Sequence, residues 1–146
     1  MSEQDYRRMA EEAFQAINAH DLDRYIRNLD SSYVWESELL TSPARGPQEA
    51  RTALETHLKA FPDLHFDVEQ ITVAGSQVIT QWQLTGTQKG EFAGIAPTNK
   101  TVRMQGCSVT EIKNGKLART RTYSDNASLF QQLGALKIGK TMTARS

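Results

Sequence analysis

Two ionisable side chains lie where they could exchange a proton with a bound molecule. His57 falls on the apolar face of an expected helix, and Glu36 lies in a short strand-like stretch beside Trp35. A half-buried imidazole is suited to acid–base work near neutral pH. The hydroxyls of Ser108 and Thr122, on two later strand-like stretches, could orient an oxygen of the same molecule. Such residues would support removal of a proton next to a carbonyl, with hydrogen-bond donors for the oxygen that becomes negative.

Each candidate also has a purely structural interpretation. Glutamate is rarely buried without a partner, so Glu36 could be a solvated residue at a strand edge. His57 could be a core histidine, and Trp82 an ordinary core aromatic rather than a residue that stacks on a ligand. Arg119 and Arg121 are expected to point outward and to pair with acidic residues on neighbouring strands. With the opposite register they would instead face inward and form an oxyanion or carboxylate site. The sequence leaves both interpretations open.

No bound metal or organic cofactor is expected. A metal site needs three or four convergent His, Cys, Asp or Glu side chains, and the histidines His20, His57 and His65 fall on separate elements. Asp63 with His65 supplies too few ligands for zinc. No glycine-rich turn precedes a helix start, so no dinucleotide site is predicted. The single cysteine, Cys107, lacks a nucleophile motif and is expected to be inert.

Length and composition favour one domain, 1–146, with a loose polar tail over 139–146. Seventeen basic and seventeen acidic residues cancel, which argues against nucleic acid or an anionic membrane surface as a partner. The start of the chain has no secretory signal pattern, and no apolar run approaches the ~20 residues that span a bilayer. One cysteine cannot form an internal disulfide, which fits a reducing compartment. We therefore expect a cytoplasmic protein.

Helices are predicted in the first part of the chain and near its end. Apolar spacing predicts helices over 8–19, 22–29 and 47–60, with a short strand at 33–37. Asp21 would cap the second helix, and Pro47 suits the first turn of the third. A last helix is expected over 127–133, and Asp125 before it has the default role of an N-cap.

Alternation of apolar and polar residues takes over after residue 64. It predicts four long strands, 65–73, 78–87, 102–112 and 116–123, in an antiparallel meander, with the turn signal Asn114-Gly115 before the last. Helices followed by a meander indicate an α+β fold. A long sheet with helices on one face must curve to bury that face, and such an arrangement tends to leave a ligand pocket between the two layers.

Short strings along the chain follow a recognisable order and spacing. These strings are Phe61-Pro62-Asp63-Leu64-His65-Phe66, Trp82 with Thr85-Gly86-Thr87, Gly90-Glu91-Phe92, Gly94-Ile95-Ala96-Pro97-Thr98-Asn99-Lys100, Asn114-Gly115-Lys116-Leu117, and Tyr123-Ser124-Asp125 with Leu129 and Gln131-Gln132-Leu133-Gly134. The ordered set covers about three-quarters of the chain. It resembles the SnoaL-like polyketide cyclases, also called ester cyclases.

The resemblance implies a nuclear-transport-factor-2-like cone: a curved antiparallel sheet with helices packed on its concave face, usually in a homodimer. It implies closure of a polyketide ring by an intramolecular aldol step, without metal or organic cofactor, on a small hydrophobic molecule. Asp125 resembles the family's terminal aspartate and so joins Glu36 and His57 as a catalytic candidate. Relatives with this fold include isomerases, dehydratases, epoxide hydrolases and non-enzymes, so the fold alone does not give the reaction.

The family pattern places the tryptophan of the second long strand inside, and alternation then assigns the other inward residues. The residues expected to face the pocket are Val78, Thr80, Trp82 and Leu84, then Met104, Gly106, Ser108 and Thr110, then Thr120 and Thr122, and on the short strand Val34 and Glu36. Of these, Trp82, Met104, Ser108, Thr120 and Thr122 are the expected substrate-binding residues. A slip of one residue would exchange the two faces.

The sequence departs from the family at positions that carry its chemistry. Arg119 and Thr122 stand where the fourth strand often has acidic residues, and Gln88 replaces a histidine. Threonine donates hydrogen bonds but is a very poor base. Two hypotheses therefore stay open. The protein could be an enzyme with Glu36 or His57 as base, or a non-catalytic small-ligand binder; a lyase, isomerase or hydrolase relative is a further alternative.

Overall fold

The structure, a computed structural model, describes residues 1–137 and 139. The polar tail expected over 139–146 lies almost wholly outside these residues. Helix α1 (Glu3–Asn18) begins at a capping box in which Ser2 and Asp5 bond each other's backbone N–H. Asp21 caps α2 (Leu22–Arg27), as expected, and α3 (Gly46–Ala60) has proline in its first turn.

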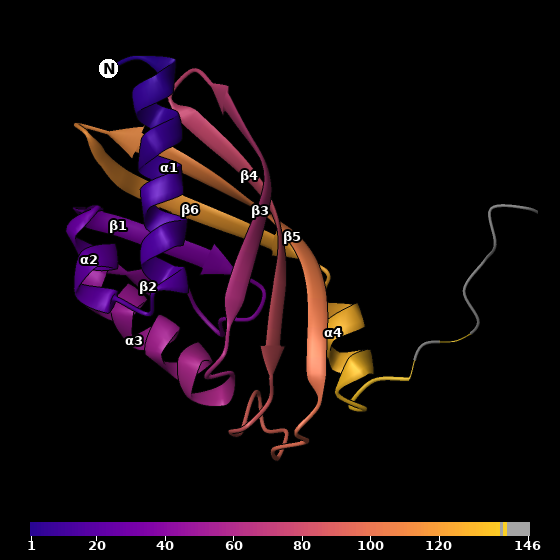
Figure 1. The fold of residues 1–146 in the computed structure, drawn as a ribbon. Coiled ribbons are helices and arrows are strands. Elements are labelled where there is room, and N and C mark those ends of the chain that lie inside the picture. The colour runs from indigo at the N-terminus through magenta and orange to yellow at the C-terminus, as the bar shows by residue number, and fades with distance from the viewer. Residues whose placement is uncertain (138, 140–146) are drawn as a thin grey trace, which may run out of the picture.

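Six strands form one sheet in the order β2-β1-β6-β5-β4-β3 (Figure 1). The strands are β1 (Leu29–Ser37), β2 (Ala44–Arg45), β3 (His65–Ala74), β4 (Gln77–Thr87), β5 (Thr101–Lys113) and β6 (Lys116–Ser124), and the chain continues into α4 (Asn126–Gln132). The four long strands, β3 to β6, pair antiparallel in sequence order. This confirms the predicted meander and the α+β class.

The sheet is not wholly antiparallel, which corrects one feature of the expected fold. Strand β1 starts at Leu29, earlier than predicted, and pairs parallel with β6. Its register places Trp35 opposite Thr120 and Ser37 opposite Thr122. The short strand β2, which was not predicted, pairs antiparallel with β1. Strand β1 precedes the meander, with β2 and α3 between them, yet it pairs with the last strand, β6. This long-range pairing has no local signal in the sequence.

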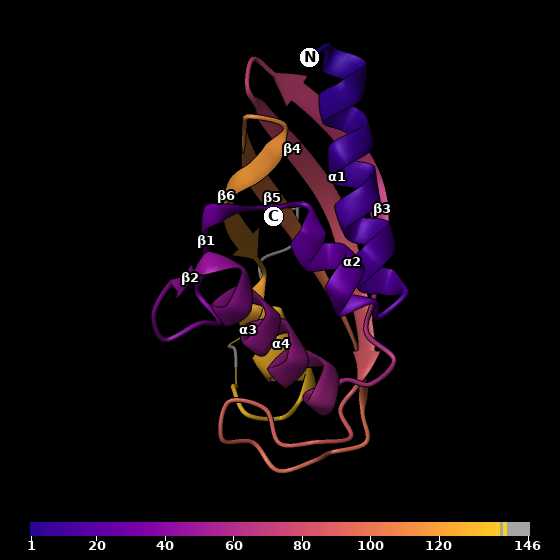
Figure 2. The ribbon, with the colours of Figure 1, turned by 90° about the vertical axis from the view of Figure 1, so that its left-hand side faces the viewer.

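Helices α1, α2 and α3 lie on the same side of the curved sheet (Figures 1 and 2). Asn18 joins the two layers, because its side chain accepts from Phe66 N at 2.7 Å and donates to Phe66 O at 2.9 Å. Buried apolar residues form two clusters between the layers, one around Tyr33 and Leu54 and the other around Trp82 and Phe61. No helix among the described residues is both long and apolar enough to cross a membrane; the cytoplasmic location stays an expectation.

Trp82 lies directly against Gly106, its partner on the neighbouring strand. The three atoms nearest to a Cβ built on Gly106 all belong to the Trp82 indole, and all lie inside the closest approach that real Cβ atoms show. The indole is 2 % exposed. The absence of a side chain at residue 106 therefore fixes the position of the tryptophan.

We predict that Gly106→Ala destabilises the protein by about 3 kcal/mol, because the added methyl must displace the indole or the strand. Urea denaturation followed by circular dichroism measures the loss. Gly139→Ala is the matched control, since a Cβ there meets nothing within 4 Å. Equal stability of the two variants would contradict this account of the packing.

Candidate functional site

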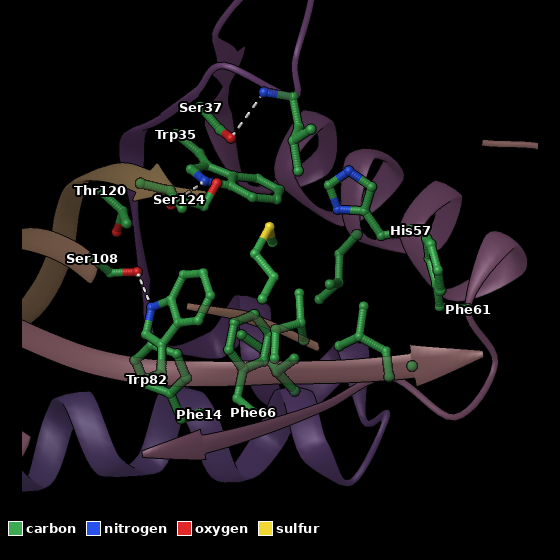
Figure 3. Close-up of a pocket in the computed structure, with 18 of the residues that line it drawn as sticks. Phe14, Trp35, Ser37, His57, Phe61, Phe66, Trp82, Ser108, Thr120 and Ser124 are labelled. Carbon is green, nitrogen blue, oxygen red and sulfur yellow. Dashed lines mark hydrogen bonds between the residues drawn. The ribbon is translucent and has the colours of Figure 1, made fainter. Parts of the chain in front are cut away.

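A cavity of about 110 Å³ lies between the helices and the inner face of the sheet (Figure 3). Aromatic and aliphatic side chains from α1, α3, α4, β1, β3, β4, β5 and β6 and from the connecting loops supply most of its lining. These apolar residues are Ala13, Phe14, Ile17, Trp35, Leu39, Leu54, Phe61, Leu64, Phe66, Trp82, Leu84, Phe92, Val102, Met104, Leu117 and Leu129. No Asp, Glu, Lys or Arg lines the cavity among the described residues. The space therefore suits a neutral, largely apolar molecule.

Hydroxyl groups supply the polar part of the lining. The indole N–H of Trp82 donates to Ser108 Oγ at 3.0 Å, and that of Trp35 donates to Thr122 Oγ1 at 3.0 Å. Thr120 bonds its neighbour across the strands, Thr110, with 3.2 Å between the hydroxyl oxygens. The polar groups of this wall are thus held in fixed positions by one another.

Two buried tyrosines, Tyr25 and Tyr33, also line the cavity. Burial raises the pKa of Tyr25 well above its ordinary value, and the neighbouring Tyr33 raises it further. Burial raises the pKa of Tyr33 as well, although hydrogen bonds with Thr120 and Tyr25 act in the opposite direction. Both phenols are therefore neutral at physiological pH and serve as hydrogen-bonding groups rather than as bases.

His57 projects from the last turn of α3 into the cavity. Its ring lies edge-on to Trp35, with 5.7 Å between the ring centres, and 6.0 Å from the centre of Phe92. Burial lowers the pKa of His57 from 6.5 to about 4, because the charged form loses its hydration. The imidazole is therefore neutral near pH 7, with one nitrogen free to accept a proton.

Glu36 does not face the cavity, so the inward orientation expected for Val34 and Glu36 is wrong. Glu36 lies on the outer face of the sheet, where Arg119 Nη2 donates to it at 2.6 Å and Arg121 Nε at 3.1 Å. The hydrogen bond from Arg119 is the largest cause that holds the pKa of Glu36 below its ordinary value. The expected outward pairing of Arg119 and Arg121 with an acid on a neighbouring strand is confirmed.

Asp125 is also absent from the cavity lining. It precedes α4 as the N-cap, and its side chain accepts from Ser128 N at 3.1 Å. This is the structural role that the sequence favours for an aspartate before a helix. Two of the three catalytic candidates, Glu36 and Asp125, are thus placed away from the cavity by strand register and by helix capping.

The inward parity expected for the long strands is correct, and Trp82, Met104, Ser108, Thr120 and Thr122 all line the cavity with His57. Sequence reasoning missed the inner residues of β1, which are Tyr33, Trp35 and Ser37, and also missed Tyr25 and Phe92. A signal for β1 was present, because its odd positions carry two large aromatics while its even positions carry a valine and a charged glutamate. Burial of the aromatics decides the face.

The loop between β4 and β5 closes one end of the cavity with Phe92. Gln88, which is fully buried, holds this loop. Its Nε2 donates to Gly90 O and Ile95 O, while its Oε1 accepts from the backbone N–H and hydroxyl of Thr98. Gln88 is therefore a structural residue. Among residues 1–137 and 139, no three His, Cys, Asp or Glu side chains are grouped as metal ligands would be.

Comparison with known proteins agrees with this geometry. The curved sheet, the covering helices and the enclosed cavity define a nuclear-transport-factor-2-like protein. The profile of the SnoaL-like polyketide cyclases matches residues 4–133, so the chain belongs to that family. None of the curated proteins matches it.

Solved structures share the fold. AclR of Streptomyces galilaeus, a candidate hydroxylase, is 26% identical with a TM-score of 0.83, over 94% of this chain and 89% of AclR. IdmH of Streptomyces antibioticus, a candidate polyketide cyclase, is 23% identical with a TM-score of 0.77, and the match covers 88% of this chain and 98% of IdmH. A candidate SnoaL-like polyketide cyclase of Jannaschia is 21% identical with a TM-score of 0.84, and the match covers 94% of this chain and 98% of the Jannaschia protein.

His57 should make the stability of the protein depend on pH in a defined window. Its pKa is lower in the folded chain than in the unfolded chain, so the stabilisation is complete above pH 6.5 and is lost as the pH falls toward 4. We expect a loss of about 2 kcal/mol between pH 7 and pH 5, from this group alone. His57→Gln should remove that part of the slope in urea titrations. An unchanged slope would contradict the burial of a neutral imidazole.

Proposed function

We propose that the protein binds a neutral, hydrophobic, polyketide-like carbonyl compound and closes a ring in it by an intramolecular aldol step without a cofactor. The observation that carries the proposal is the position of His57. Apart from the two tyrosines, whose pKa values are raised, His57 is the only ionisable side chain that lines the cavity among the described residues. Membership of the cyclase family supports the same reaction class.

The proposed step uses the neutral form of the imidazole. His57 removes a proton from the carbon next to one carbonyl, and the electron pair of that C–H bond passes to the carbonyl oxygen as an enolate. The enolate carbon attacks a second carbonyl of the same molecule, and a new C–C bond closes the ring. The alkoxide formed then takes the proton back from the imidazolium. Atoms and charge balance, and His57 returns to its neutral form.

In the protein without a ligand, burial makes His57 a weak base, since its pKa is about 4. A negative oxygen in the cavity reverses this effect, because an opposite charge nearby favours the imidazolium. Hydroxyl donors on the opposite wall, such as Ser108 and Thr122, stabilise the same negative oxygen. The imidazole and the hydroxyls therefore depend on each other for the proton transfer.

A specific observation favours a second candidate function, the binding of a small apolar molecule without chemistry. No carboxylate lines the cavity among the described residues, and the family's usual acid–base position on the fourth strand carries Thr122 instead. The same cavity would serve such a binder without His57 as a base. The two functions differ in what the loss of the imidazole does: it abolishes turnover in the first and only reshapes a binding site in the second.

The enzyme hypothesis predicts turnover that depends on His57. The probe is ortho-acetylphenylacetone, a neutral aryl diketone whose aldol closure gives a bicyclic hydroxyketone that chromatography can quantify. His57→Asn should lower kcat/KM at least about 100-fold, the usual contribution of a general base. Glu36→Gln is the matched control, because Glu36 lies on the outer face of the sheet, and it should retain activity. Turnover that survives in His57→Asn contradicts the mechanism; binding without turnover in the wild type favours the second function.

We also propose that the protein is a homodimer that pairs through the outer face of the sheet. Helices α1 to α3 cover only the other face (Figure 2). On the outer face, Tyr123 is 58 % exposed and lies opposite Cys107, which in turn lies opposite Gln81. A large exposed aromatic in the middle of a sheet face is typical of an interface core.

Sedimentation equilibrium at micromolar concentration should therefore give twice the chain mass. Tyr123→Glu should shift the protein to monomer, because it places a charge in the proposed interface. Thr52→Glu, which places the same charge at an exposed position of α3 on the opposite side of the sheet, is the control and should leave the dimer intact. A wild-type monomer contradicts the proposal.

A further inference from the structure

One row of the sheet carries a hydroxyl on each of four adjacent strands. Thr80 on β4 is paired with Ser108 on β5, Ser108 with Thr122 on β6, and Thr122 with Ser37 on β1. Residues in register share a face of the sheet, and Ser37, Ser108 and Thr122 line the cavity. We refer to these three residues as the hydroxyl row.

Each hydroxyl of the row already accepts a hydrogen bond from an N–H group. The donors are the indole of Trp82 to Ser108, the indole of Trp35 to Thr122, and the backbone N–H of Leu39 to Ser37 at 3.2 Å. An indole N–H can only donate, so the hydroxyl must use a lone pair for it and keeps its own hydrogen available. No hydrogen bond from these three hydroxyls to an acceptor is present among the described residues.

Three O–H donors thus stand side by side at the wall of an apolar cavity. Ser108 is buried, and Ser37 and Thr122 are half-buried. Donors removed from water are normally satisfied, and here the acceptors are those that a ligand would bring. Because adjacent strands lie about 4.8 Å apart, neighbouring hydroxyls can hold one oxygen between them or two oxygens about 5 Å apart. The hydroxyl row is therefore matched to carbonyl oxygens along one edge of a ligand.

Charge narrows the ligand class further. A carboxylate buried in this cavity would find hydroxyl donors but no cation, because no Lys or Arg lines the cavity among the described residues. Burial of an unpaired charge is far more costly than burial of a hydrogen-bonded ketone. A ketone or quinone satisfies the donors without that penalty.

We propose that Ser37, Ser108 and Thr122 form a carbonyl-binding subsite that selects neutral ketones over both their hydrocarbon analogues and carboxylates. This subsite rests on the proposed function and assigns the orientation of its ligand. Figure 3 shows Ser108 on one side of the cavity and His57 on the other. A carbonyl held by the hydroxyl row therefore directs the rest of the molecule toward the imidazole, and an enolate oxygen would form against three preorganised donors.

The test compares three bicyclic probes of similar size: alpha-tetralone, a neutral ketone; tetralin, its hydrocarbon analogue; and naphthoate, a carboxylate. Both tryptophans of the chain line the cavity, so quenching of tryptophan fluorescence reports binding directly. Wild-type protein should bind alpha-tetralone at least about ten-fold more tightly than tetralin, the sum of two or more neutral hydrogen bonds. Naphthoate should bind more weakly than tetralin at neutral pH.

Substitutions in the hydroxyl row should act on the ketone alone. Thr122→Val keeps the shape of the side chain and removes the O–H donor. It should lower the affinity for alpha-tetralone about five-fold and leave the affinity for tetralin unchanged. Thr122→Ser restores the donor and should restore the ketone affinity. Thr80→Val is the matched control, since Thr80 belongs to the same row of the sheet but does not line the cavity. Ser108→Ala repeats the test on β5. If Ser108→Ala does not fold, the affinities of Thr122→Val decide the test.

The outcomes separate the subsite from the proposed function. Equal affinity of wild-type protein for alpha-tetralone and tetralin overturns the subsite and leaves cavity binding intact. An equal loss of affinity for both ligands in Thr122→Val does the same. Tighter binding of naphthoate than of alpha-tetralone overturns the selection for neutral ligands. Absence of binding by all three probes overturns the proposed function and the subsite together.

Discussion

The contact between Trp82 and Gly106 determines much of what surrounds the cavity. Only a residue without a side chain allows the indole to lie against β5. In that position the indole N–H reaches Ser108, and the ring forms an edge-on contact with Phe66, with 4.9 Å between the ring centres. Gly106 thus fixes the position of one aromatic wall of the cavity and of the N–H group from which Ser108 accepts. A protein interior is packed too densely for such a site to adjust independently of its neighbours.

Charge is distributed so that the inside of the cone is neutral. The one glutamate of β1, Glu36, lies outside between Arg119 and Arg121, while the inner positions of the same strand carry tyrosine, tryptophan and serine. The alternation of a strand makes this separation possible, since adjacent residues face opposite sides. Among the described residues, polarity on the inside comes from hydroxyls, phenols and the imidazole of His57, groups that bind oxygen without imposing a net charge. Such a cavity stabilises charge only when a reaction creates it.

Several residues that carry the family resemblance serve the shape of the cavity rather than its chemistry. Asp63 accepts from the backbone N–H and hydroxyl of Thr87, which fixes the chain entering β3 against the end of β4. Asp125 caps the N-terminus of α4. Gln88, where the sequence departs from the family, likewise serves the shape, because it holds the loop that carries Phe92. Membership of the family therefore supports the fold and the cavity more strongly than it supports a particular reaction. The reacting groups are a separate matter, since Thr122 stands where relatives often carry an acid.

The sequence by itself determined the α+β class, the four-stranded meander, the caps at Asp21 and Asp125, and the inward face of β4, β5 and β6. These features follow from local patterns, because alternation, turn residues and capping side chains act over a few positions. Only the tertiary structure decided the parallel pairing of β1 with β6, and with it the exclusion of Glu36 and the inclusion of Trp35 and Ser37. That pairing joins segments far apart in the chain, and its register depends on which aromatics the packed helices can bury. The low pKa of His57 was likewise beyond the sequence, since it arises from neighbours that reach the imidazole only in the folded chain.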